Sequence, residues 1–251
     1  MSFQHDGYIF EIFSGIQGEG ILVGERQIFV RLVGCNLQCA FCDTPASRDE
    51  TPRTSIEQTP GLRDFRSYPN PLSASDVLGM IEHLDSRRIH HSIAITGGEP
   101  LVQADFCTLL AKGLKASGRR VMLETNGTLY DALANLRPYL HLVSMDIKIQ
   151  STARAGDLLP THGRFLAECA GVPTYVKIVV GSETTDAEVI AAAKMAAGLD
   201  PETTIVLQPV TPTGGVAAPA AECVLHWQEE CKLLLPNVRV IPQCHKFMNQ
   251  L

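Results

Sequence analysis

Apolar residues along this chain follow two alternating patterns. Short runs rich in β-branched residues predict strands at residues 28–33, 92–96, 120–124, 142–146, 175–180, 204–208 and 239–242. Segments with apolar residues three or four positions apart lie between some of these runs and predict helices at residues 77–84, 106–114 and 187–197. Repeated alternation of strand and helix is typical of an α/β fold with a parallel sheet. We therefore predict a partial, incomplete β/α barrel.

The length and charge of the chain narrow the class of protein. A chain of 251 residues fits one barrel-sized domain, so we predict a single domain over residues 1–251. The formal net charge of −6 argues against binding to a nucleic-acid backbone, which requires clustered basic residues. The sequence has neither a basic, apolar leader nor a run of about eighteen apolar residues, so we expect no membrane association.

The cysteines divide into one cluster and a scattered remainder. Those outside the cluster occur mostly in apolar or helical contexts, at Cys107, Cys169, Cys223, Cys231 and Cys244. Buried free thiols are the expected state of such residues, which predicts a reducing, cytoplasmic location.

One segment has no regular period. Residues 46–71 are rich in proline and charged residues, and we predict an irregular surface insertion there. Long loops often cover active sites but do so only in some proteins. The sequence leaves open whether this insertion is a lid.

Polar and glycine residues follow the ends of the predicted strands. Their positions are 34–44, 97–100, 124–127, 144–148 and 208–210. In a parallel α/β sheet the carboxyl ends of the strands lie at one edge, where active sites form. We therefore expect these segments to meet at a common site.

The most specific motif is the cysteine cluster Cys35, Cys39 and Cys42, spaced C-x3-C-x2-C. Three thiolates in one short loop can ligate three irons of a 4Fe–4S cluster and leave the fourth iron open for a ligand that is not protein. A structural zinc site would need a fourth ligand at nearby spacing, and none follows. A disulfide with a spare thiol does not account for the tight spacing of all three residues.

The cysteine motif, followed by Gly97-Gly98-Glu99-Pro100, resembles the radical S-adenosylmethionine superfamily. Within it, the chain closely resembles the 7-carboxy-7-deazaguanine synthase family. The motifs that carry this closer resemblance are residues 14–20 (SGIQGEG), Arg31, residues 42–44 (CDT), residues 124–127 (ETNG) and residues 242–246 (PQCHK).

The resemblance implies a 4Fe–4S cluster on the three cysteines, with S-adenosylmethionine chelating the open iron. It assigns no catalytic side chain, because the radical comes from the cofactor. Glycines at 97–98 would let the backbone approach the methionyl amine, although a tight turn alone would also explain them. The residues that the resemblance assigns to cofactor binding are Phe41, Cys42, Asp43, Gly97, Gly98, Glu99, Glu124, Asn126, Ser144, Asp146, Lys148, Gln208, Pro209 and Val210.

A second group of residues is assigned by resemblance to a pterin substrate. It comprises Ile16, Gln17, Gly18, Glu19, Arg31, Thr96, His245 and Leu251, with residues 242–251 forming a tail that covers the substrate. Glu19 suits the N–H groups of a pterin, and the Arg31 guanidinium suits its carboxylate or a ring oxygen. Thr44 is the implied hydroxyl ligand of Mg²⁺.

Structural interpretations of the same residues remain open. Residues 17–20 also fit a polar hairpin, Arg31 an outward-facing charge, Thr44 a turn residue and the tail a frayed chain end.

The family's reaction converts 6-carboxy-5,6,7,8-tetrahydropterin to 7-carboxy-7-deazaguanine and ammonia, within the deazapurine pathway to queuosine. The resemblance implies hydrogen abstraction at C6, ring contraction and regeneration of S-adenosylmethionine. It also implies an external electron donor such as flavodoxin and a homodimer.

Two other functions remain open at this point. A radical enzyme that activates a glycyl radical site in a partner protein would share the cysteine loop, but would not need the Gln17-Glu19 pair or the His245 tail. A non-catalytic iron–sulfur electron carrier or redox sensor would leave the open iron and the Gly97-Gly98-Glu99-Pro100 motif unexplained.

Overall fold

The computed structural model of the protein describes residues 6–49 and 51–250. Its main sheet has ten strands in the order β12-β11-β10-β9-β8-β7-β3-β2-β4-β5, and β1 pairs with β6 in a separate ribbon. The strands are β1 (Asp6–Gly7), β2 (Ile9–Ile16), β3 (Arg26–Leu32), β4 (Arg53–Glu57), β5 (Phe65–Pro69), β6 (Leu72–Ser73), β7 (Ser92–Gly97), β8 (Val121–Thr125), β9 (Leu142–Ile147), β10 (Thr174–Val180), β11 (Thr204–Pro209) and β12 (Val238–Val240).

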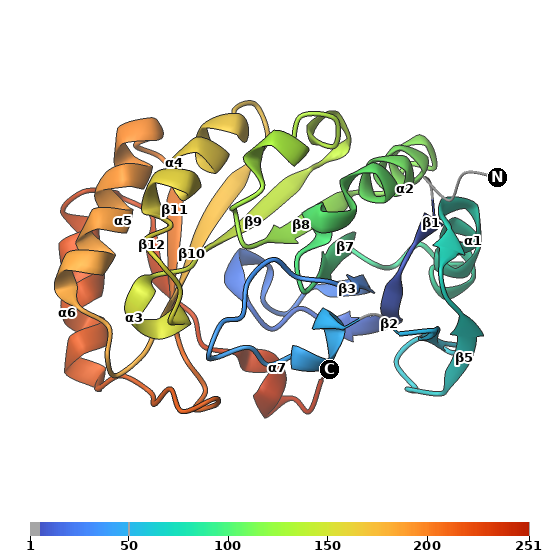
Figure 1. Cartoon of the computed structure of the whole chain (residues 1–251), viewed down its shortest axis with the longest axis horizontal. Helices are drawn as coiled ribbons and strands as arrows, with labels where there is room; N and C mark the ends of the chain where they lie inside the picture. Colours follow the sequence, from blue (N-terminus) through green and yellow to red (C-terminus); the bar gives the residue numbers. More distant parts are fainter. Residues whose placement is uncertain (1–5, 50, 251) are drawn as a thin grey trace.

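The pairing from β3 through β7, β8, β9, β10, β11 and β12 is parallel throughout. Because β12 and β5 lie at opposite edges of this sheet, it curves without closing (Figure 1). The predicted partial β/α barrel is therefore confirmed. Each of the strands predicted from the sequence is present, with bounds that differ by a residue or two.

Longer helices lie along the outside of the curved sheet, and the short helix α7 lies on its opposite side (Figure 1). The helices are α1 (Ala74–Leu84), α2 (Ala104–Ala116), α3 (Gln150–Ala153), α4 (Leu159–Glu168), α5 (Asp186–Leu199), α6 (Ala221–Lys232) and α7 (Cys244–Phe247). The predicted helices correspond to α1, α2 and α5. Capping boxes fix the starts of two of them, at Ser73 with Asp76 and at Thr185 with Glu188.

The core lies between the sheet and these outer helices. The central strands are buried on both faces, as in Ser92–Gly97, where the first five residues are all buried. On the outer face their side chains pack against apolar residues of α1 and α2, such as Ile81 and Leu110, which are fully buried. This double burial explains why the strands appear in the sequence as nearly continuous apolar runs.

Strand β2 was not anticipated from the sequence. It pairs antiparallel with β3, with Phe13 opposite Phe29 and the two rings stacked 5.0 Å apart. The connection after β2 is a hairpin closed by the Gln17 N–H, which donates to the Glu25 carbonyl at 2.8 Å. Residues 17–20 thus lie in a polar hairpin, as one interpretation held, but this does not exclude a role at the site.

The prediction of an irregular segment at residues 46–71 is wrong in its central part. Strands β4 and β5 form an antiparallel hairpin there, and β4 pairs in parallel with β2, which extends the main sheet. Ile56 is the only large apolar residue of β4, and prolines flank both strands, so the periodic signal is weak. Edge strands commonly carry charged residues and proline, which prevent further pairing.

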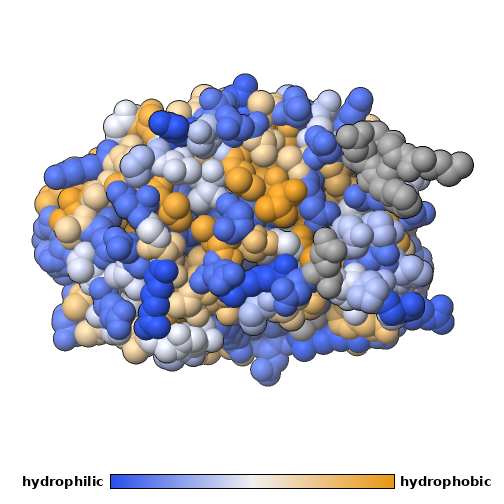
Figure 2. Space-filling view, viewed as in Figure 1, coloured by the Kyte–Doolittle hydropathy of each residue, from blue (hydrophilic) through white to orange (hydrophobic). Residues whose placement is uncertain are grey.

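The surface gives no sign of a broad apolar face on the side shown in Figure 2, where hydrophobic side chains form small groups among hydrophilic ones. None of the helices in residues 6–49 and 51–250 is both long and apolar enough to cross a membrane.

Candidate active site in a cavity inside the curved sheet

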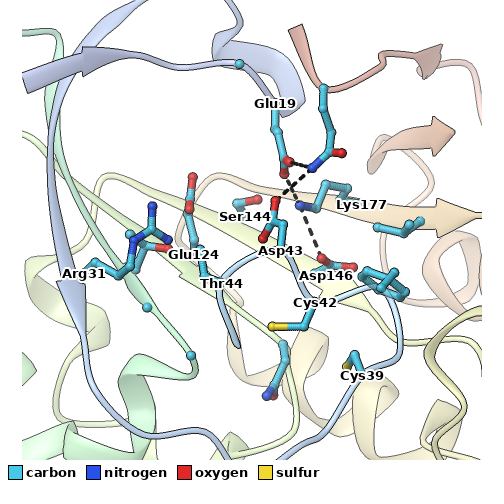
Figure 3. A pocket seen from close by; sticks show the side chains of 18 of the residues that line it. Glu19, Arg31, Cys39, Cys42, Asp43, Thr44, Glu124, Ser144, Asp146 and Lys177 are labelled. Atoms are coloured by element: carbon cyan, nitrogen blue, oxygen red, sulfur yellow. Dashed lines mark hydrogen bonds and ion pairs between the residues drawn. The ribbon is translucent and has the colours of Figure 1, made fainter. Parts of the chain in front are cut away.

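A cavity of about 460 Å³ brings together segments from many strands of the sheet. The cysteine loop after β3, the glycines at the end of β7 and the ends of β8, β9 and β11 all line it, as predicted from their positions at the ends of strands. The β2–β3 hairpin, the middle of β10 and the C-terminal tail complete the lining. Figure 3 shows part of this lining, with acidic and basic side chains on one side and the sulfurs of Cys39 and Cys42 on another.

The cysteine loop is held in place by backbone contacts. The Ala40 N–H donates to the Ala153 carbonyl at 3.1 Å, and the Arg48 guanidinium donates to the Cys39 carbonyl at 3.1 Å. Cys35, Cys39 and Cys42 are all free, half-buried thiols that line the cavity.

Gly97 and Gly98 bring the end of β7 against the start of the cysteine loop. Gly97 has φ +148°, and a Cβ there would lie 2.5 Å from the Leu32 carbonyl oxygen. A Cβ on Gly98 would overlap the Gly34 carbonyl and lie 2.8 Å from Cys35 Cβ. Both positions therefore require glycine. The Glu99 N–H donates to the Gly34 carbonyl at 2.8 Å and joins the two loops.

A chain of alternating charges crosses the cavity. Glu19 pairs with the Lys177 ammonium, which also lies 3.3 Å from Asp146 Oδ2 (Figure 3). Lys148 Nζ contacts the same Asp146 oxygen at 2.8 Å. The Lys148 ammonium in turn lies 4.8 Å from the centre of the Phe41 ring in the cysteine loop. This chain joins the β2–β3 hairpin to the cysteine loop.

Burial and pairing act in opposite directions on these groups. Burial by itself would raise the pKa of Glu19, but the Lys177 ammonium and its hydrogen bond lower that pKa to about 2. Burial would lower the pKa of Lys177 and of Lys148, but the carboxylates beside them raise both. Glu19, Lys177 and Lys148 are therefore charged at neutral pH.

Polar side chains of the hairpin and of β3 form another wall. Gln17 is buried and donates through Nε2 to Gln27 Oε1 at 2.9 Å and to Glu124 Oε1 at 2.7 Å. Arg31 points into the cavity lining and pairs through Nε with Glu11 Oε1 at 2.8 Å. Arg31 is thus not an outward-facing solvated charge.

The C-terminal tail folds against this wall. The Cys244 N–H donates to the Gly18 carbonyl at 2.8 Å, and a Cβ on Gly18 would overlap His245. Gln243 Nε2 donates to Glu19 Oε1 at 2.8 Å and to Asp43 Oδ2 at 3.1 Å. The start of the tail is therefore held against the β2–β3 hairpin and the cysteine loop, and His245, Lys246 and Gln250 line the cavity, whereas Phe247 is exposed.

Comparison with known proteins assigns this chain to a family. Residues 29–209 match the Radical SAM superfamily. A 7-carboxy-7-deazaguanine synthase of Geobacter sulfurreducens is 42% identical over 96% of this chain and 96% of its own length. The chain belongs to the 7-carboxy-7-deazaguanine synthase family. A synthase of the same name from Methanopyrus kandleri is 35% identical over 96% of this chain and 93% of its own length.

Two solved structures share the fold of this chain. The crystal structure of QueE from Escherichia coli superimposes with a TM-score of 0.63 at 23% identity, over 96% of this chain and 95% of that chain. A radical SAM methyltransferase from Sphaerobacter thermophilus superimposes with a TM-score of 0.60 at 15% identity, over 87% of this chain and 66% of that chain.

Membership in this radical SAM family implies a 4Fe–4S cluster and S-adenosylmethionine. The donor set fits the cluster, because three unpaired thiols face one cavity. Burial raises the pKa of Cys35 and Cys39 while the thiols have no metal, since a buried thiolate without a counter-charge is unfavourable.

Two buried acceptors fit the nucleotide-like cofactor. Gln208 Oε1 and Asp146 Oδ1 are buried and have no hydrogen-bond partner among the described residues, and both side chains belong to the cavity lining. Buried polar atoms without partners are rare in native proteins. The amino groups of S-adenosylmethionine are donors of the kind that these two oxygens require.

Glu99 does not lie where the sequence interpretation put it. Its side chain is fully buried and is absent from the cavity lining. The carboxylate accepts hydrogen bonds from Leu101 N at 3.0 Å, Thr125 Oγ1 at 2.8 Å and Asn126 N at 2.7 Å. Glu99 therefore supports the loop that borders the cavity, and burial raises its pKa to about 7 in spite of these bonds.

A cation could be held where the cysteine loop meets the tail. Thr44 lines the cavity, and its side chain does not cap the short helix that follows. One ligand atom each from Glu19, Asp43 and His245 lies within 4.8 Å of the others. The two carboxylates are the ligand type that Mg²⁺ prefers. Lys177 and Gln243 already donate to the two oxygens of Glu19, and Gln243 also donates to Asp43 Oδ2.

Most residues assigned by resemblance line the cavity. These are Ile16, Gln17, Gly18, Glu19, Arg31, Cys35, Cys39, Phe41, Cys42, Asp43, Thr44, Thr96, Gly97, Gly98, Glu124, Asn126, Ser144, Asp146, Lys148, Gln208, Val210 and His245. Glu99 and Pro209 are not part of the lining, and Leu251 lies outside the described residues.

Sequence interpretation missed other residues of the lining. They include Glu11, Leu37, Arg48, Thr125, Lys177, Gln243 and Lys246. Lys177 carried a signal that could have been used, because it is a lone charged residue inside the buried run Thr174–Val180. A charge in such a strand requires a partner inside the protein.

Proposed function

We propose that this protein converts 6-carboxy-5,6,7,8-tetrahydropterin to 7-carboxy-7-deazaguanine with release of ammonia. One observation carries the proposal: a single cavity has the three cysteines on one wall and Arg31, Glu19 and His245 on the others. A radical cofactor at the cysteines would therefore lie beside a polar pocket suited to a carboxylated heterocycle. The curated relatives that match the whole chain bear the name of this activity.

The cluster and S-adenosylmethionine, when bound, supply the radical that removes hydrogen from the substrate. The role of the protein is to bind and orient the pterin. The ionised carboxylate of Glu19 would accept its N–H groups. Arg31 uses Nε for Glu11, which leaves its Nη groups for the substrate carboxylate.

The tail and the cysteine loop would enclose the bound pterin. His245 lies on the cavity wall beside Gly18 and within 4.8 Å of a carboxylate oxygen of Asp43 in the cysteine loop, where it would contact the substrate. Thr44 would bind Mg²⁺ together with the substrate carboxylate and water, which suits the preference of Mg²⁺ for few protein ligands. Gln208 and Asp146 would accept from the amino groups of S-adenosylmethionine.

The remaining parts of the proposal concern the cell. We propose a single-domain cytoplasmic enzyme that acts as a homodimer and receives electrons from an external donor such as flavodoxin. The family's need for a reductant supports the donor, and the scattered free thiols support the cytoplasm.

An anaerobic turnover assay tests the function. The cluster is reconstituted, reductant, S-adenosylmethionine, Mg²⁺ and 6-carboxytetrahydropterin are added, and products are followed by mass spectrometry. We expect deazapurine without stoichiometric loss of S-adenosylmethionine. Release of 5′-deoxyadenosine without deazapurine would refute the pterin as substrate and favour a radical activase. Failure to cleave S-adenosylmethionine at all would favour an iron–sulfur carrier.

A further inference from the structure

Lys177 is a buried cation without an assigned role. It lies in the middle of β10, and its side chain is only 13% exposed. Its ammonium group contacts two carboxylates, Glu19 through Oε2 and Asp146 through Oδ2 at 3.3 Å. Burying an ammonium group is costly, so a lysine at this position must contribute through the groups that it holds.

Both oxygens of the Glu19 carboxylate are fixed by the protein. Lys177 donates to Oε2, and Gln243 Nε2 donates to Oε1 at 2.8 Å. These two donors determine the plane in which the carboxylate lies. Each carboxylate oxygen can accept more than one hydrogen bond, so both remain able to accept from a ligand in the cavity.

We propose that Lys177 is a positioning residue that fixes the Glu19 carboxylate as a two-oxygen acceptor for the adjacent N–H groups on the pyrimidine edge of the pterin, an inference that rests on the proposed function. Two parallel N–H to oxygen bonds need a carboxylate that is ionised and correctly turned. Gln243 belongs to the tail and could supply only one of the two fixed contacts. Lys177 supplies the other, and it also places a positive charge beside the Glu19 carboxylate.

The neighbouring Lys148 provides a matched comparison. It is another buried lysine, and it contacts the same Asp146 oxygen as Lys177 at 2.8 Å. Lys148 is not paired with Glu19; its ammonium lies over the Phe41 ring in the cysteine loop. Loss of either lysine therefore removes one cation from Asp146, but only loss of Lys177 releases Glu19.

A double-mutant cycle measures whether Lys177 acts through Glu19. Dissociation constants for 6-carboxytetrahydropterin are measured anaerobically by calorimetry on cluster-reconstituted enzyme with S-adenosylmethionine. The proteins are wild type, Lys177→Met, Lys177→Arg, Glu19→Gln, Lys148→Met and the double variant Lys177→Met/Glu19→Gln. The dissociation constant for S-adenosylmethionine is measured on each protein as a second readout.

We expect Lys177→Met to weaken pterin binding by about 10- to 100-fold, the loss associated with a charge-assisted hydrogen bond. The same change made in Glu19→Gln should weaken binding by less than about threefold, because the acceptor is already altered. Lys177→Arg should recover most of the affinity, since it keeps the cation. Lys148→Met should reduce affinity for S-adenosylmethionine more than affinity for the pterin.

Equal losses of pterin affinity in the wild-type and Glu19→Gln backgrounds would overturn the proposal. So would an unchanged affinity in Lys177→Met, or a loss that falls on S-adenosylmethionine and leaves the pterin unaffected. If wild type itself does not bind the pterin, the proposed function fails, and this result is separate from the comparison between variants.

A structure without substrate tests the positioning by itself. In crystals of Lys177→Met or of the more polar Lys177→Gln, we expect the Glu19 carboxylate to leave its wild-type plane, because Gln243 alone holds only one of its oxygens. A Glu19 side chain that keeps its wild-type position and contact with Gln243 in both variants would overturn the proposal, whatever the substrate of the enzyme.

Discussion

Replacing Glu99 with glutamine tests whether this residue binds the cofactor or supports the site from behind. Three donors converge on its carboxylate: two backbone N–H groups, of Leu101 and Asn126, and the hydroxyl of Thr125. Glutamine has nearly the same shape but only one acceptor oxygen. The Asn126 N–H, at 2.7 Å from Oε2, would then face the new amide NH₂ group.

The expected loss of stability in Glu99→Gln follows from one buried donor that loses its acceptor. Such a loss costs about 1–3 kcal/mol, because the Glu99 side chain is fully buried and water cannot replace the lost bond. For a domain of this size about 2 kcal/mol lowers Tm by roughly 4–8 °C. Thermal unfolding followed by circular dichroism under anaerobic conditions measures the shift, and calorimetry measures S-adenosylmethionine binding to the same protein.

Glu57→Gln is the matched control. Glu57 is also buried and also accepts three hydrogen bonds, in its case all from backbone N–H groups, those of Ser14, Gly61 and Arg63. Like Glu99 it does not line the cavity, but none of its three donor residues lines the cavity either, whereas Thr125 and Asn126 do. We expect a similar loss of Tm in both variants. Affinity for S-adenosylmethionine should change little in Glu57→Gln and by less than about tenfold in Glu99→Gln.

The pH dependence of the unfolding free energy provides an independent test. Burial raises the pKa of Glu99 from 4.5 to about 7, so the folded protein binds its proton more tightly than the unfolded chain does. Stability from this group is therefore present below pH 4.5 and is lost as pH rises through about 7. The difference in unfolding free energy between wild type and Glu99→Gln should shrink over this range. An unchanged Tm together with lost S-adenosylmethionine binding would refute the supporting role.

Three further changes test other parts of the site. Arg31→Met should weaken pterin binding by about 10- to 100-fold in calorimetry while leaving the cluster absorbance unchanged; an unaltered dissociation constant would exclude the guanidinium as a carboxylate ligand. Arg63→Ala should speed hydrogen exchange in the tail, because the Arg63 guanidinium donates to the Asn249 carbonyl; identical exchange would show that this contact does not hold the tail. Cys39→Ser should abolish the visible absorbance of the reconstituted cluster, whereas the exposed Cys223→Ser should retain it.

The parallel part of the fold was accessible from the sequence because its strands are buried on both faces. Runs such as Thr174–Val180 stand out from the amphipathic helices around them. The strand-end rule then located the cysteine loop and the glycines after β7 correctly at one cavity.

The side-chain partners of residues inside the cavity could not be predicted from the sequence in the same way. Lys177 is 158 residues from Glu19 in sequence and Gln243 is 224 residues from it, yet both hold its carboxylate. Hydrophobic periodicity says which face of a strand is buried, but not which distant side chain it meets there. The role of Glu99 was missed for the same reason, since its three donors become neighbours only when the loops after β7 and β8 come together.

The β4–β5 hairpin shows most clearly why a segment with a weak pattern can still matter to the site. The buried carboxylate of Glu57 accepts from Ser14 N at 2.8 Å, Gly61 N at 3.0 Å and Arg63 N at 2.9 Å, which ties the hairpin turn to β2. From the same turn, Arg63 donates to the carbonyl of Asn249 in the tail. The β4–β5 hairpin therefore contacts both β2 and the C-terminal tail. These two contacts connect the insertion to the site. We therefore expect the β4–β5 hairpin to support the position of the C-terminal tail.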